Sequence, residues 1–184
     1  MDLKDDKQLE RYIIENFEWF HRHPELPYEE EKTTEKIREL LTAAGIEILP
    51  YPLATGLVAV VRGTKMGSRM IALRCDIDAL PIREEADVPY RSENEGRMHA
   101  CGHDFHITAG IGAAILLQKC REELCGTVKF IFQPAEEESH GALKILETDV
   151  MDDVEQIWGF HADPTNAVGV IGVREGYVTA AVDR

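Results

Sequence analysis

The sequence predicts an α/β protein, a three-layer α/β/α sandwich around a mixed, largely parallel sheet. Segments of helical period alternate along the chain with nearly unbroken apolar runs, such as residues 57–61 and 70–73. Continuous apolar strands are typical of sheets that helices bury on both faces. The 184 residues, of which 44% are hydrophobic, are enough for one domain with a real core.

Two amphipathic helices are predicted in the first quarter of the chain. The first covers about the first twenty residues, and the prolines that follow end it. His21 and His23 lie at its C-terminal end, where a histidine interacts favourably with the helix dipole, so a structural role is expected for both. The second helix stops at Gly45, and the acidic run at residues 29–31 is interpreted as its solvated start, without a special role.

Strand patterns dominate the remainder of the chain, with one long helix among them. That helix is predicted over about residues 105–119, and its glycines at positions 110 and 112 lower helix stability, which indicates close packing against the sheet. A turn is predicted at residues 62–67. The predicted strands cover residues 46–48, 57–61, 70–73, 127–132, 156–160 and 168–173.

The net charge of the chain indicates which partners to expect, and its cysteines indicate the cellular compartment. There are 34 Asp and Glu against 20 Lys and Arg, which gives a formal charge of −14. Such a surface repels phosphate backbones and anionic lipid heads, so neither a nucleic acid nor a membrane is an expected partner. The longest apolar stretch is too short to span a bilayer, and no signal peptide is visible. The four cysteines lack the spacing of a disulfide framework, which predicts a cytoplasmic protein with reduced thiols.

The stretch from His99 to His106 concentrates side chains that bind metals or move protons. Cys101 and His103 are two residues apart, so in an extended backbone both would point the same way and could face one ion. Gly102 between them has no Cβ and can adopt a φ that other residues resist. A thiolate with an imidazole suits Zn²⁺ and similar borderline metals. A reduced core cysteine beside a hydrogen-bonded histidine would fit the same stretch.

Four polar clusters lie at or near predicted strand ends, which is where α/β sheets gather their sites. Each cluster alone has a simpler interpretation, as a surface turn, a solvated helix start or a structural histidine. Four clusters of ligand type in one small domain are a much stronger indication of a site. They are Asp76 with Asp78, the Cys101 loop, the glutamates at 136–138, and His161.

The adjacent Glu136 and Glu137 indicate hydrolytic chemistry. Neighbours in a regular strand point to opposite sides, but Pro134 bends the chain, so one carboxylate can bind a metal while the other faces its bound water. A metal lowers the pKa of bound water to about 7. A carboxylate beside that water can take its proton and then protonate a leaving amine, which is the minimum equipment for amide hydrolysis.

Five motifs follow one another along essentially the whole chain: His-Arg-His-Pro-Glu-Leu at 21–26, Arg-Cys-Asp-Ile-Asp-Ala-Leu-Pro-Ile at 74–82, Met-His-Ala-Cys-Gly-His-Asp at 98–104, Phe-Gln-Pro-Ala-Glu-Glu at 132–137, and Gly-Phe-His-Ala-Asp-Pro at 159–164. Together they resemble the amidohydrolase branch of the aminoacylase-type metallopeptidases. That branch includes hippurate hydrolases, N-acyl-amino-acid deacylases, auxin-conjugate hydrolases and N-acetyldiaminopimelate deacetylases.

The resemblance implies hydrolysis of the amide bond of N-acyl amino acids or short peptides, with one or two divalent ions, Zn²⁺ or Mn²⁺. By motif position, Glu136 would be the general base and acid. The implied metal ligands are Cys101, His103, Glu137 and His161. The residues implied to support these ligands without binding the metal are Asp76, Asp78, Asp104 and His106.

The resemblance also implies that residues 1–184 are the N-terminal portion of the catalytic domain. Family members continue into a lid and dimerisation domain, then into a return segment with one more ligating histidine, and both are expected to be absent here. We therefore expect weak or no activity from this chain alone, and an exposed sheet edge or apolar patch. A homo-oligomer or a complementing chain is the expected partner.

Two other functions stay open at this point. A non-catalytic metal-binding remnant, or one half of a split enzyme, would keep the same ligands. A cysteine hydrolase would use Cys101 as its nucleophile and His161 as its base. That third function leaves the glutamate pair and Asp76 without a role.

Overall fold

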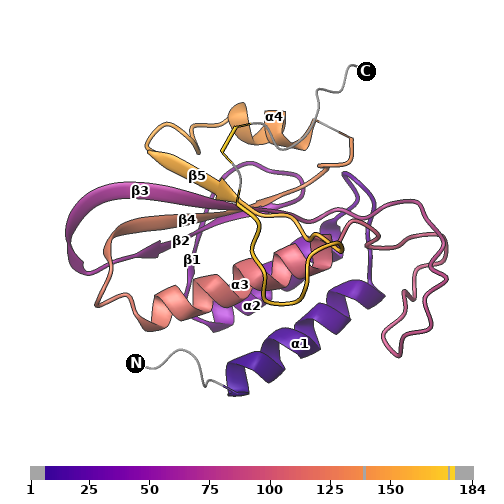
Figure 1. Cartoon of the computed structure of the whole chain (residues 1–184). Helices are drawn as coiled ribbons and strands as arrows, with labels where there is room; N and C mark the ends of the chain where they lie inside the picture. The colour runs from indigo at the N-terminus through magenta and orange to yellow at the C-terminus, as the bar shows by residue number, and fades with distance from the viewer. Residues whose placement is uncertain (1–6, 139, 174, 177–184) are drawn as a thin grey trace.

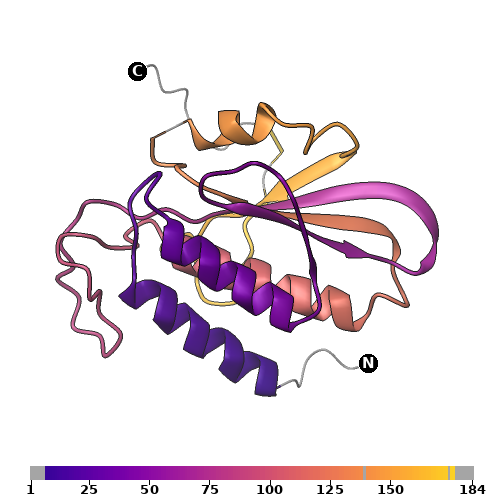
Figure 2. The same cartoon turned by 180° about the vertical axis from the view of Figure 1, so that it is seen from behind.

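The structure is a computed structural model that describes residues 7–138, 140–173 and 175–176. Its helices are α1 (Lys7–Arg22), α2 (Glu31–Ala43), α3 (His103–Lys119) and α4 (Gly141–Leu146). Its strands are β1 (Glu47–Leu49), β2 (Leu57–Arg62), β3 (Lys65–Asp76), β4 (Cys125–Gln133) and β5 (Gln156–Gly159). Helices α1, α2 and α3 lie on one side of the sheet and α4 on the other, as Figure 1 and the reverse view in Figure 2 show. The predicted three-layer class is confirmed.

The five strands form one mixed sheet in the order β1-β2-β4-β3-β5. The pairings of β1 with β2 and of β2 with β4 are antiparallel, whereas β3 pairs in parallel with both β4 and β5. Because parallel strands end at the same edge, the segments that follow β3, β4 and β5 emerge close together. Asp76, the last residue of β3, is paired directly with Gln133, the last residue of β4.

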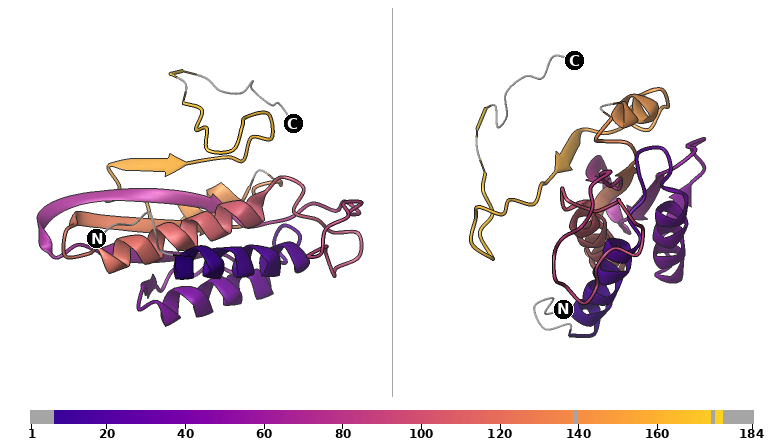
Figure 3. Two further views of the ribbon diagram at one scale, coloured as in Figure 1. Left: turned by 60° about the horizontal axis from the view of Figure 1, so that its bottom comes forward. Right: turned by 90° about the vertical axis from the view of Figure 1, so that its right-hand side faces the viewer.

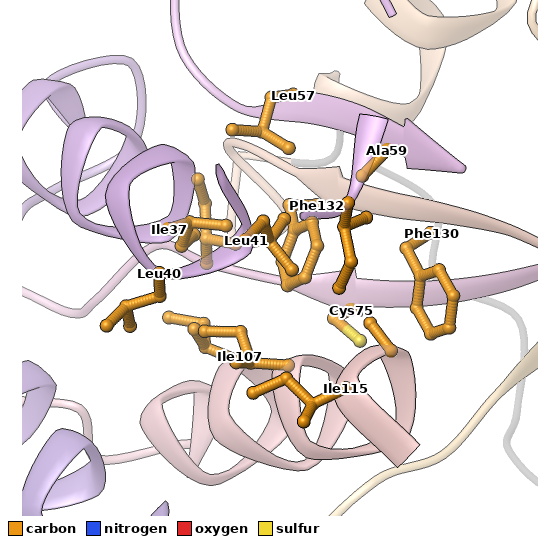
Figure 4. Close-up of a cluster of buried hydrophobic side chains, with 14 of the residues drawn as sticks. Ile37, Leu40, Leu41, Leu57, Ala59, Cys75, Ile107, Ile115, Phe130 and Phe132 are labelled. Carbon is orange, nitrogen blue, oxygen red and sulfur yellow. The ribbon is translucent and has the colours of Figure 1, made fainter. Parts of the chain in front are cut away.

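Side chains that alternate along the strands fill two cores, one on each face of the sheet. Along β2, Leu57 and Ala59 join the larger core under α2 and α3, while Val58 between them joins the smaller core beside α4. Figure 4 shows side chains of α2 and α3 directed at Phe130 and Phe132 in the larger core. Full burial of one such large apolar side chain contributes roughly 1.5–3 kcal/mol.

The predicted strand at residues 168–173 is absent, and these residues form turns and irregular backbone. A strand needs a neighbour to pair with, and no strand of the described residues lies beside this segment. Its apolar side chains are exposed, and Trp158 on the edge strand β5 is 61% exposed. Figure 3 shows β5 at the edge of the sheet. The segment after it first returns to α3, where Phe160 packs against His106. The exposed side chains agree with the expectation of an exposed edge and apolar patch.

The acidic run before α2 is not uniformly solvated as predicted. Glu29 and Glu31 are exposed, but Glu30 is completely buried.

The short helix α4 was not predicted, because six residues give too little periodicity to recognise. All four cysteines are free. Within the described ranges, none of the helices has the length and apolar character needed to cross a membrane.

Candidate metal centre

His103 lies at the centre of a cluster of side chains that can bind a metal, at the ends of the parallel strands. It begins α3, and it is 1% exposed. Its Nδ1–H donates to the backbone oxygen of Asp78 at 2.9 Å, which leaves Nε2 as the unprotonated nitrogen. Nε2 is buried without a hydrogen-bond partner among the described residues, 3.7 Å from Asp76 Oδ2, 3.8 Å from Glu137 Oε1 and 4.0 Å from Glu136 Oε2.

Cys101 and His161 complete the cluster from two different loops. The Cys101 sulfur lies 3.3 Å from His161 Nε2, while His161 Nδ1 donates to the carbonyl of Ala162 at 2.8 Å. Gly102 has the positive φ of 81° that the sequence indicated. A Cβ there would lie 3.1 Å from the Cβ of Ala162, so glycine serves both the backbone conformation and the close approach of the two loops.

Three groups of described side chains could hold a metal ion, and His103 belongs to each. The ligand atoms within each group lie within 4.8 Å of one another. The first group is Cys101, His103 and His161, and the second is Asp76, His103 and His106. The third is His103, Glu136 and Glu137. A neutral imidazole whose other nitrogen donates to a backbone carbonyl is the usual form of a metal-binding histidine. The sulfur, nitrogen and carboxylate donors therefore fit a divalent transition metal.

His106 is placed in one of these groups, but its own hydrogen bonds occupy both ring nitrogens. Its Nδ1–H donates to Asp76 Oδ1 at 2.5 Å, and its Nε2 accepts from the Ala162 N–H at 2.8 Å. Arg74 donates to the other oxygen of Asp76 at 2.5 Å. Burial alone would raise the pKa of Asp76, but the His106 hydrogen bond and the charge of Arg74 outweigh it and hold that pKa at about 2. The sequence had not indicated this contact of Arg74, although Arg74 lies within a recognised motif.

The two glutamates reach the same side because the backbone turns just before them. Ala135 has a φ of 48°, which breaks the alternation of a strand. The N–H of Glu137 then donates to Asp78 Oδ2 at 2.9 Å. Burial and the neighbouring charge of Glu137 raise the pKa of Glu136 above its ordinary value. A carboxylate with a raised pKa is better suited to accept a proton near neutral pH.

The surroundings of Cys101 oppose its use as a nucleophile. Burial and the adjacent carboxylate of Glu137 raise the pKa of the Cys101 thiol to about 12. Reactive cysteines instead have a lowered pKa in an electropositive environment. Although Cys101 and His161 are in contact, this pair therefore fits a role in cation binding better than the cysteine-hydrolase alternative.

Asp104 points away from this cluster and anchors the start of α3. Its Oδ2 accepts from His21 Nδ1 at 2.6 Å, and the other ring nitrogen, Nε2, donates to Glu84 Oε1 at 3.0 Å. His21 is 9% exposed. The Asp104 hydrogen bond raises the pKa of His21 to about 8, against the opposing effect of burial and with support from Glu84. Asp104 thus fixes the helix that carries His103.

The charge on His21 predicts that stability falls above neutral pH. The pKa is raised in the folded state from 6.5 to about 8, so the stabilisation is complete below pH 6.5 and is lost as the pH rises through 8. At 1.36 kcal/mol per pKa unit, the loss is about 2 kcal/mol. Urea unfolding at pH 6 and pH 9 should show this loss in the wild type and in a His23→Gln control, but not in His21→Gln. Equal pH dependence in all three proteins would contradict the assignment.

Comparison with known proteins shows which family this chain is similar to. The model of peptidase family M20/M25/M40 matches residues 72–183. The N-acetylcysteine deacetylase of Bacillus subtilis (strain 168) is 50% identical over 180 residues, which is 97% of this chain and 47% of that protein. Thermostable carboxypeptidase 2 of Saccharolobus solfataricus is 40% identical over 185 residues, which is 98% of this chain and 47% of that protein.

The same relationship holds for a solved structure. The crystal structure of the Bacillus subtilis YXEP protein, a dinuclear metal-binding peptidase from the M20 family, matches with a TM-score of 0.91 at 49% identity. The match covers 93% of this chain and 48% of that one. The present chain thus spans about half the length of the relatives it resembles.

Proposed function

Because the chain belongs to peptidase family M20/M25/M40, we propose that it forms part of a metal-dependent amidohydrolase that cleaves the amide bond of N-acyl amino acids or short peptides. One observation carries this proposal. The buried Nε2 of His103 has no hydrogen-bond partner among the described residues and faces Glu136 and Glu137 within 4.0 Å. A buried nitrogen of this kind costs free energy unless a ligand satisfies it, and a divalent cation between these groups would do so.

The proposed ligands are Cys101, His103, Glu137 and His161. One or two ions held there would polarise the amide carbonyl and lower the pKa of a water molecule. The sulfur of Cys101 favours Zn²⁺, whereas the nitrogen and oxygen donors also suit Mn²⁺. Asp78 would support two ligands at once, since it accepts hydrogen bonds from His103 and from the N–H of Glu137. His106 would hold Asp76 and the Ala162 loop without binding the ion.

Glu136 would carry the proton through the reaction. Its carboxylate takes a proton from the attacking water as the new carbon–oxygen bond forms. The tetrahedral intermediate then breaks its carbon–nitrogen bond, and Glu136 gives the proton to the departing amine. The products are a carboxylic acid and a free amino acid, and the glutamate returns to its starting state.

We further propose that residues 1–184 are the N-terminal portion of the catalytic domain. The chain spans 47% of the length of both relatives described above, which supports this division. The groups that bind the substrate carboxylate and a further metal-ligating histidine would then come from the other half of such a protein, in the same chain or in a complementing one. The exposed edge strand β5 is the surface at which we expect that half, or a second copy, to dock. Free cysteines fit the reducing cytoplasm, which is the compartment we propose.

The test is a chimera in which this chain replaces the matching 47% of the Bacillus subtilis N-acetylcysteine deacetylase. With Zn²⁺ or Mn²⁺ present, the chimera should release amino acids from a panel of N-acetyl and N-benzoyl substrates. The chain alone should be at least about 100-fold slower, because the other half is proposed to supply groups that complete the site. Equal rates from the two proteins would contradict the proposed division. A folded, metal-loaded chimera that hydrolyses none of the panel would contradict the activity and favour a non-catalytic remnant.

A further inference from the structure

Glu30 is a fully buried carboxylate that contacts the loop of the glutamate pair. Its side chain is 0% exposed. Its Oε1 accepts from the N–H of Ala135 at 2.8 Å, and its Oε2 accepts from the Thr55 hydroxyl at 2.7 Å. Burial raises the pKa of Glu30, and the hydrogen bonds from Thr55 and Ala135 oppose that rise. Burying a carboxylate is costly, so these bonds have to compensate for a large desolvation.

The helix that follows Glu30 does not need this carboxylate. The side chain of Glu30 makes no capping bond to α2. The free N–H groups of the helix go instead to Glu25, whose two oxygens accept from Lys32 at 3.2 Å and from Thr33 at 2.8 Å. The Glu30 carboxylate also hydrogen-bonds the local backbone at Tyr28 and Glu30, but its contact with Ala135 links two segments 105 residues apart.

Ala135 is the residue at which the backbone departs from strand geometry. Its φ of 48° lies in the left-handed region, which is unfavourable for a residue with a Cβ. Glu136 and Glu137 follow directly, and this turn lets two neighbouring side chains face His103. On the far side, Asp78 accepts from the N–H of Glu137. Two buried carboxylates thus hold alternate N–H groups of one short loop.

We propose that Glu30 is a positioning residue for the Glu136–Glu137 pair. By accepting the hydrogen bond of Ala135, it stabilises the left-handed turn that aims both glutamates at the metal cluster. The roles of the two glutamates rest on the proposed function, whereas the effect of Glu30 on their placement does not. Partners that orient metal ligands are typically worth 10–100-fold in metal affinity.

A matched pair of variants tests this role. Glu30→Met keeps the length of the side chain and removes the acceptor, whereas Glu30→Gln keeps one oxygen for the Ala135 N–H and an amide for Thr55. In a Co²⁺ titration followed by visible absorbance, the dissociation constant should rise at least 10-fold in Glu30→Met and less than threefold in Glu30→Gln. Glu31→Met, an exposed neighbour, is the control and should bind like the wild type.

Glycine at position 135 provides the decisive rescue, because it adopts a positive φ without steric cost. In the double variant Glu30→Met/Ala135→Gly, most of the lost Co²⁺ affinity should return. Wild-type affinity in Glu30→Met, or an equal loss in the double variant, would overturn the proposal. Thermal melting checks that each variant is folded. If Glu30→Met is not, Glu30→Asp, whose carboxylate is one methylene too short, carries the same expectation.

The chimera gives a second, independent readout. There, Glu30→Met should lower kcat at least 10-fold with KM within twofold, since the substrate contacts are unchanged. A chimera that is inactive even with Glu30 present contradicts the proposed function alone, and the Co²⁺ titration of this chain still decides the role of Glu30. An equal change in kcat for Glu31→Met would contradict the positioning role.

Discussion

Replacing Glu136 by Gln should lower the turnover of N-acyl amino acids by about 10²–10⁴-fold in the chimera while leaving metal content unchanged. General acid–base catalysis contributes a factor of this size, and an amide can neither accept the proton of water nor return it to the amine. Because Glu137 rather than Glu136 is the proposed ligand, the metal should stay bound. Steady-state kinetics together with metal analysis of the same samples would measure both quantities.

The neighbouring residue supplies the control for this variant. Glu138 is an exposed carboxylate next to the pair, so Glu138→Gln changes the charge equally without touching the cluster, and its kcat should stay within about twofold of the wild type. A fall of less than tenfold in Glu136→Gln would show that another group moves the proton. Loss of metal in the same variant would show that the roles of Glu136 and Glu137 have been exchanged.

Metal binding should also stabilise the fold of this chain by several degrees. An ion at 100 times its dissociation constant stabilises the folded state by about 2.7 kcal/mol. For a domain of this size, that corresponds to a rise of roughly 5–10 °C in Tm. Calorimetry before and after removal of the metal with a chelator, followed by readdition of Zn²⁺ or Mn²⁺, would measure the change.

The same treatment separates the metal and cysteine alternatives. In the chimera, chelation should abolish hydrolysis and readdition of the ion should restore it, whereas a cysteine hydrolase would keep its activity throughout. A variant with both Cys101→Ala and His103→Ala should show no ion-dependent change in Tm. A chelator-resistant activity, or an unchanged shift in Tm in the double variant, would contradict the assigned ligands.

Local patterns in the sequence were sufficient for much of the sheet. The apolar run at 57–61 lies within β2, and the predicted strand at 127–132 lies within β4, because both faces of these strands are largely buried. The exception in composition is Lys129 of β4, which is buried with its ammonium donating to the backbone oxygen of Val150. The segment 168–173 has a similar composition and is not a strand. An apolar segment forms a strand only when a neighbouring strand exists to pair with it. The residues of the segment do not show whether such a neighbour exists.

Motifs identified the residues of the candidate site but not the hydrogen bonds among them. That His106 uses both ring nitrogens for Asp76 and Ala162 depends on segments 30 and 56 residues away. The burial of Glu30 has the same origin, because its partners Thr55 and Ala135 are distant in sequence. No pattern within three consecutive glutamates could single out the middle one. Only the tertiary packing of α2 against the ends of the strands does so.

The first measurement to make is the metal content of the purified chain, by mass spectrometry beside the Cys101→Ala/His103→Ala variant. We expect this chain by itself to assemble a metal site around the buried Nε2 of His103. This expectation predicts between one and two divalent ions per wild-type chain and essentially none in the variant. A folded wild-type chain that binds no metal, or a variant that keeps the wild-type content, would contradict it.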